Sequence, residues 1–133
     1  MKFYRLLLII PLMILLGCND YSLQDPFIAP NGLYGFKDAD GKIRIKPKYQ
    51  EARSFNEDFA SVKLNSKWGF IDKTGNVVIP PKYSDVGYFS EGLAQVRLGG
   101  KIGDWAAECF VDKYGNEYLD MTEDQARQKM KER

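Results

Sequence analysis

This chain of 133 residues contains no histidine, and it has only two cysteines and two tryptophans. Without histidine it has neither a histidine-dependent nucleophilic triad nor a histidine-ligated metal site. Its 19 basic and 18 acidic residues nearly cancel. Nucleic-acid binding needs a concentrated basic surface, and the sequence has no polybasic run. We therefore expect no catalytic activity, no metal, no cofactor and no nucleic-acid partner.

Long apolar runs are absent except at the N-terminus. Lys2 and Arg5 precede an apolar stretch that ends in Leu15-Leu16-Gly17-Cys18. A basic start, a short apolar core and a small residue before a cleavage point are typical of a secretory signal peptide. A membrane-spanning helix needs about 20 apolar residues, and this stretch is shorter and contains Pro11. The pattern predicts a signal peptide over residues 1–17.

The Leu-Leu-Gly-Cys ending resembles the lipobox of bacterial lipoproteins. In that family the cysteine is acylated, the chain is cut before it, and the new amino group is acylated as well. The resemblance implies that Cys18 is the lipidated first residue of a mature chain, with residues 18–25 as a tether. Asn19 stands where some inner-membrane lipoproteins have aspartate, which favours the outer membrane. The alternatives are an uncleaved anchor or an incidental cysteine.

Lipidation of Cys18 would leave Cys109 as the one free thiol. In an oxidising compartment such a thiol can react or pair between molecules. Cys109-Phe110-Val111 is an apolar, strand-like run, however, and free cysteine often packs as a small hydrophobe. We favour packing.

A pattern recurs after 34 residues. Lys67-Trp68-Gly69-Phe70-Ile71-Asp72 is echoed by Tyr34-Gly35-Phe36-Lys37-Asp38, and Pro81-Lys82-Tyr83 by Pro47-Lys48-Tyr49. Similarity at a fixed period indicates one supersecondary unit that is repeated along the chain. The predicted units are 25–58, 59–92 and 93–120, and the last carries an insertion of about six residues near 104–109.

Each unit has the features of antiparallel strands. Phe59–Leu64 and Leu93–Leu98 are short runs with partial alternation of apolar and polar residues. Asn65-Ser66 and Gly99-Gly100 follow them and are expected to form hairpin turns. The next predicted strand is 67–72, and a third covers 76–79. We expect the third strand to stop at Pro80-Pro81, because proline has no N–H to donate to a ladder.

Acidic residues recur at the predicted turns. Asp72 lies three residues before Gly75, and Asp38 and Asp112 hold the same position in the other units. A carboxylate that accepts from turn amides, followed by a glycine with positive φ, is typical of a tight turn. A structural role is therefore favoured over a catalytic carboxylate pair.

These residues resemble the WG repeat family, whose units contain Lys-Trp-Gly-Phe-Ile-Asp, then Thr-Gly, Val-Ile-Pro-Pro-Lys-Tyr and Phe-Ser-Glu-Gly-Leu-Ala. The resemblance covers about 26–120. It implies an all-β fold, an antiparallel meander of about two and a half repeats, and an interaction or envelope role. The third unit has Ile102 at the tryptophan position and lacks the Pro-Lys-Tyr segment.

Within the second unit, Trp68 and Phe70 share one strand face and are the expected apolar anchors. Gly69, and Gly35 in the first unit, are expected to allow close backbone approach. The aromatic residues that break the repeat are functional candidates. Trp105 lies in the insertion, and Tyr88 stands where the first unit has Ser54. Exposed aromatic side chains often anchor partner proteins or sugar rings, although Trp105 could equally fold back onto the sheet.

Residues 121–133 predict a short C-terminal α-helix from Glu123 to about Glu132. Thr122 is the expected N-cap and Gln125 completes a capping box. Met121, Ala126 and Met130 form an apolar stripe that could cover one end of the sheet.

The predicted protein is a lipid-anchored envelope module that binds a protein partner through its repeat surface and the 104–109 loop. The alternative is a glycan or peptidoglycan binder that uses its exposed aromatics, and a carboxylate enzyme is third. The oligomeric state stays open.

Overall fold

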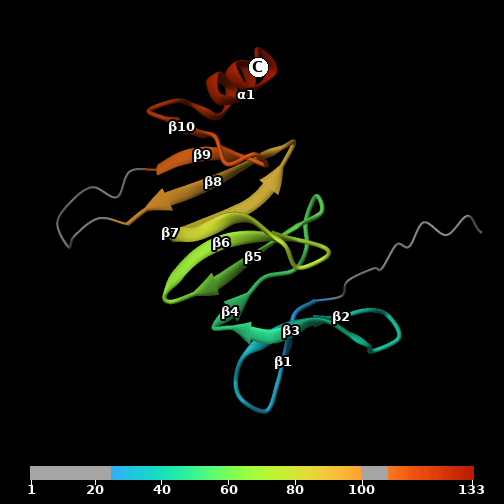
Figure 1. Ribbon diagram of the computed structural model, residues 1–133. Helices are drawn as coiled ribbons and strands as arrows, with labels where there is room; N and C mark the ends of the chain where they lie inside the picture. Colours follow the sequence, from blue (N-terminus) through green and yellow to red (C-terminus); the bar gives the residue numbers. More distant parts are fainter. Residues whose placement is uncertain (1–24, 100–107) are drawn as a thin grey trace, which may run out of the picture.

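The computed structural model describes residues 25–99 and 108–133. In this part the regular structure is antiparallel β-strands, with one helix at the end (Figure 1). Its elements are β1 (Phe27–Ile28), β2 (Tyr34–Lys37), β3 (Ile43–Tyr49), β4 (Glu51–Ala52), β5 (Phe59–Leu64), β6 (Lys67–Asp72), β7 (Val77–Ser90), β8 (Leu93–Leu98), β9 (Glu108–Asp112), β10 (Glu117–Leu119) and α1 (Glu123–Lys131).

The strands form two sheets whose order follows the chain. One sheet has the order β1-β2-β3, and the other runs β10-β9-β8-β7-β6-β5-β4. Every pairing is antiparallel. The predicted all-β antiparallel meander with a short C-terminal helix is therefore confirmed.

A two-residue hairpin turn joins β5 to β6. Leu64 pairs with Lys67 across a two-residue hairpin turn, in which Asn65 and Ser66 both have positive φ, 48° and 62°. Positive φ at both central residues is the requirement of a type I′ turn, whose twist matches that of the flanking strands. This turn sets the register of β5 against β6 without a break.

The expectation that the third strand stops at Pro80-Pro81 is wrong, because β7 continues through both prolines to Ser90. Between the pairs Phe70↔Ile79 and Trp68↔Tyr83, β6 advances by two residues and β7 by four. The prolines lie in this bulge, where no ladder donor is required of them. β7 can therefore pair with β6 along its first half and with β8 along its second.

Gly69 makes that bulge possible. A Cβ atom at this position would lie 2.5 Å from the carbonyl oxygen of Ile79 and 2.7 Å from the nitrogen of Pro81. Gly35 has the same relation to the first unit, where a Cβ atom would lie 2.5 Å from the carbonyl oxygen of Ile45. The predicted close approach is confirmed, and the segment that approaches is the proline-containing strand.

The core repeats with the sequence. One cluster contains Phe36, Ile45, Tyr49, Ala60 and Val62, and the next contains the residues 34 positions later, Phe70, Ile79, Tyr83, Ala94 and Val96. Trp68 and Phe70 are both buried in the second cluster, as predicted for the anchors of this unit. Each cluster thus fills the space between one unit and the next.

Helix α1 closes the last unit. The Thr122 hydroxyl accepts from the backbone N–H of Gln125 at 3.3 Å, and the Gln125 side chain accepts from the Thr122 N–H at 2.9 Å. This is the predicted capping box. Ala126 is buried against Leu93 and Tyr118, and Met121 and Met130 pack beside them. The helix thus covers the part of the sheet where Leu93 and Tyr118 lie, beside β10 at the edge of the sheet (Figure 1).

The predicted signal peptide lies outside the described residues, as does the tether up to residue 24. Over residues 25–99 and 108–133, no helix combines the length and apolar character that crossing a membrane requires.

Candidate functional site

Tyr88 lies on the second half of β7 with 54% of its surface exposed. Val86 pairs with Val96 and Phe89 with Ala94, so β7 advances by three residues while β8 advances by two. Such a bulge inserts one unpaired residue and changes the direction of the side chains around it. Val86 and Phe89 consequently both enter the core, and Tyr88 between them points to solvent.

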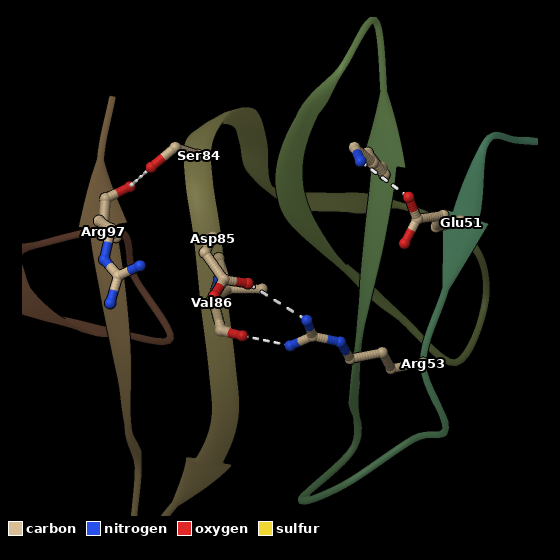
Figure 2. A network of polar contacts seen from close by, with 7 residues as sticks. Glu51, Arg53, Ser84, Asp85, Val86 and Arg97 are labelled. Atoms are coloured by element: carbon tan, nitrogen blue, oxygen red, sulfur yellow. Dashed lines mark hydrogen bonds and ion pairs between the residues drawn. The ribbon is translucent and has the colours of Figure 1, made fainter. Parts of the chain in front are cut away.

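A polar network joins this part of β7 to the first unit (Figure 2). The Arg53 guanidinium donates to the Val86 carbonyl oxygen and, at 3.2 Å, to the Asp85 carboxylate. The same guanidinium lies over the ring of Trp68, with its central carbon 4.4 Å from the ring centroid. Cation–π contact of this kind stabilises by about 0.5–2 kcal/mol, depending on exposure. Arg53 therefore covers Trp68 and joins two units with one side chain.

A second set of charges lies on the neighbouring strands. The Arg97 guanidinium on β8 donates to the Glu108 carboxylate on β9 at 2.8 Å, and Gln95 donates to the same carboxylate at 3.0 Å. In Figure 2, Arg97 also faces Ser84, whose hydroxyl donates to the Arg97 carbonyl oxygen at 3.1 Å. Exposed ion pairs contribute little stability, about 0–1 kcal/mol. Their effect here is to fix the orientation of the side chains on the surface.

Between these side chains lies a hollow of about 180 Å³. It opens on β7, β8 and β9, and its lining residues are Asp85, Val86, Gly87, Gln95, Val96, Arg97 and Glu108.

The family comparison agrees with this architecture. The family described as WG containing repeat matches residues 34–68 and 68–101, which together make up just over half of the chain. The chain belongs to the WG repeat family. Comparison with curated proteins and comparison with solved structures gave no match.

The turn aspartates of the WG units have the structural role predicted for them. Each accepts from two backbone amides, two and four residues further along: Asp38 from Asp40 and Lys42, Asp72 from Thr74 and Asn76, and Asp112 from Tyr114 and Asn116. A glycine with φ near +80° follows each of them. Burial alone would raise the pKa of all three carboxyls, but side-chain donors (Arg44 to Asp38, Thr74 to Asp72, Asn116 to Asp112) together with these amides outweigh it and hold the pKa of each below the ordinary value.

Cys109 on β9 packs in the second core cluster, the one that contains Trp68, as the apolar run around it predicts. It is 1% exposed and free, in a cluster with Val96 and Val111. Burial, together with the negative charge of Glu117, raises the pKa of the Cys109 thiol to about 11. At neutral pH the thiol is therefore protonated, and protonated thiols are poor nucleophiles.

Of the predicted functional residues, only Tyr88 lies in the described part of the chain. Cys18 and Trp105 lie outside it. Within the described part, no group of three or more potential metal-ligating side chains comes together.

The register of the third WG unit differs from the expected one. In the second unit Trp68 lies opposite Lys63, and the equivalent residue of β8, Arg97, lies opposite Glu108. Glu108 rather than Ile102 thus has the tryptophan position. Similarity between the units places the insertion near 104–109, and the pairing of β8 with β9 assigns all of it to the segment before Glu108.

Sequence reasoning also missed Arg53 and Gly87. The two residues are 34 positions apart and are therefore equivalent, yet one carries a guanidinium and the other has no side chain. The difference between Arg53 and Gly87 is visible when the units are compared position by position, as is the difference between Ser54 and Tyr88.

Proposed function

We propose that this WG repeat protein is a lipid-anchored module of the bacterial cell envelope that binds a protein partner without catalysis. The observation that carries the proposal is the exposed Tyr88, held on a bulge between two buried residues and beside a hollow edged by charged groups. Aromatic side chains surrounded by polar residues are typical anchors of protein interfaces. The membrane attachment rests on the Leu-Leu-Gly-Cys sequence at Cys18, and Asn19 favours the outer membrane.

The absence of catalysis is supported by the chemistry of the residues. The chain has no histidine. The recurring aspartates are engaged by turn amides, and the Cys109 thiol is buried with a raised pKa. A carboxylate enzyme would need two acids in one cleft with divergent pKa values. Asp85 and Glu108 both line the hollow, but each is already engaged by an arginine.

We expect labelled palmitate to enter the protein expressed in a bacterial host and to be absent from the Cys18→Ser variant. Mass spectrometry of the mature N-terminus should show an acylated Cys18. Equal labelling of both forms, or an unmodified N-terminus at another residue, would refute the lipid anchor. This result bears on attachment alone and leaves the interaction surface to be tested separately.

Substitution of Tyr88 by alanine is expected to reduce recovery of a crosslinked envelope protein by about tenfold, equivalent to about 1.4 kcal/mol. Its effect on unfolding should stay within about 0.5 kcal/mol, because the side chain is exposed. Tyr114→Ala is the matched control, since Tyr114 is 77% exposed in a turn. The measurement is crosslinking in solubilised envelopes, followed by quantitative mass spectrometry.

The same experiment separates the alternative function. A glycan binder would be retained on purified cell-wall material, would be released by free sugars, and would lose this retention when Trp105 is replaced by alanine. Crosslinking to one protein that free sugars do not compete with supports the protein partner. Identical recovery with wild type, Tyr88→Ala and Tyr114→Ala contradicts the role given to Tyr88.

A further inference from the structure

Within the repeat, the hollow on β7, β8 and β9 has an occupied counterpart. Asp85 pairs with Arg97 just as Glu51 pairs with Lys63 in the unit before, 34 residues earlier in both cases. In that earlier unit, the next strand supplies Trp68 opposite Lys63, and Arg53 lies above the ring. The same location therefore holds an indole ring in one unit, and in the next it is a hollow among the described residues.

Two substitutions between the units create the volume. Glu108 has the register of Trp68, and Gly87 has the place of Arg53. The ring of Trp68 and the guanidinium of Arg53 have no counterpart among the described residues at this place, and Val86 and Val96 are part of the lining of the hollow. The hollow therefore lies at the place where the unit before has the indole ring of Trp68 and the guanidinium of Arg53.

The remaining lining still suits an aromatic ring. In the second unit, the Lys63 ammonium lies 5.7 Å from the centroid of the Trp68 ring. Arg97, at the equivalent position, presents a planar guanidinium that stacks on aromatic faces better than an ammonium does. The Glu108 carboxylate holds that guanidinium at 2.8 Å. A ring that enters the hollow would meet the backbone at Gly87 and the guanidinium of Arg97, which Glu108 holds in place.

Helix α1 leaves this end of the last unit free. It covers the opposite end of β8, where Ala126 packs on Leu93 and Arg127 donates to the carbonyl oxygens of Ser90 and Glu91. The hollow is therefore a continuation of the interface between units, at a place where no further unit of the described chain follows.

We propose that the hollow binds an aromatic side chain, tryptophan or tyrosine, of the protein partner. This proposal rests on the protein-binding function above and names the group that the partner supplies. Tyr88 and the hollow would then contact the same partner, because both lie on the bulged half of β7.

The probe is N-acetyl-tryptophanamide, titrated into the full chain in detergent micelles and followed by backbone and methyl NMR. We expect saturable shifts at Val86, Gly87 and Val96, with a dissociation constant of about 1 mM, a weak affinity suited to one isolated ring. N-acetyl-leucinamide should give shifts at least about tenfold weaker, since it lacks the ring.

Two variants refill the hollow by different routes. Gly87→Arg restores the cover found in the second unit, and the space at this glycine permits it, because the nearest atom to an added Cβ is the Gln95 carbonyl oxygen at 3.4 Å. Glu108→Trp restores the ring in the register of Trp68. Each should weaken probe binding by about tenfold or more, whereas Tyr114→Ala should leave it unchanged. If one of these two variants does not fold, probe binding by the other still tests the proposal.

Shifts that survive both refilling variants, or that map away from the hollow, overturn the proposal, as does the absence of shifts at 10-fold excess over the expected dissociation constant. It is also overturned if Trp105→Ala moves the Val86 and Val96 resonances without probe, since the chain itself would then supply the ring. Tyr88-dependent crosslinking with no probe binding would leave the protein-binding function intact and refute the hollow alone.

Discussion

Gly69→Ala is expected to lower the free energy of unfolding by about 3 kcal/mol, at the upper end of the usual cost of overpacking. The added methyl group would stand 2.5 Å from the Ile79 carbonyl oxygen and 2.7 Å from the Pro81 nitrogen. Both atoms belong to backbone, and the prolines restrict how that backbone can move. The bulge of β7 would have to shift, and with it the packing of Trp68. Urea unfolding followed by tryptophan fluorescence measures the loss.

Gly87→Ala is the matched control for this prediction, because it also lies in a bulged region of the same sheet. Its nearest neighbour would be 3.4 Å away, an ordinary contact, so its effect should stay within about 0.5 kcal/mol. Gly35→Ala should repeat the large effect in the first unit. Equal stability of the Gly69 and Gly87 variants would mean that the close approach does not constrain the fold.

The sequence predicts those parts of the fold that depend on contacts between neighbouring residues. The turn at Asp72, the hairpin at Asn65-Ser66 and the capping box at Thr122 depend on contacts within four residues, and all three are predicted correctly. The path of β7 depends on Gly69 and Pro81 together, which are 12 residues apart. Each residue was interpreted by its local preference, and their joint effect appears only when the two strands are paired.

The candidate site was less predictable for a related reason. Tyr88 was found because it differs from Ser54 in the equivalent position of the repeat. Arg53 was missed because its contacts, Trp68 and Asp85, come from two other strands. Glu108 was missed because an insertion can be placed anywhere between two matching segments without changing the similarity. The pairing of β8 with β9 locates the insertion, and the similarity between units of one chain does not.

Asp112→Ala is expected to reduce the free energy of unfolding by about 3 kcal/mol, the upper range for hydrogen bonds to a charged group. Asp112 is 2% exposed, and its second carboxylate oxygen accepts from the buried Tyr118 hydroxyl at 2.9 Å and from the Asn116 side chain at 2.9 Å. Removal leaves the Tyr118 hydroxyl buried without a partner. Asp72→Ala is the matched comparison. Its turn is exposed and has no buried tyrosine, so about 1 kcal/mol is expected.

The pH dependence tests whether the charge of Asp112 matters as well as its shape. Burial alone would raise the pKa of this carboxyl, but donors from Asn116, Tyr118 and Tyr114 outweigh it and hold the pKa below the ordinary 3.8. A lowered folded pKa contributes stability that is fully present above the unfolded value and is lost as the pH falls through the folded value. The stability difference between wild type and Asp112→Asn should therefore be constant near neutral pH and shrink below about pH 4. A difference that persists unchanged to pH 2 would assign the whole effect to hydrogen-bond geometry. Tyr118→Phe removes the donor alone, and in this variant the acid-induced loss of stability should be smaller than in wild type and complete at a higher pH, because the folded pKa of Asp112 then lies closer to its unfolded value.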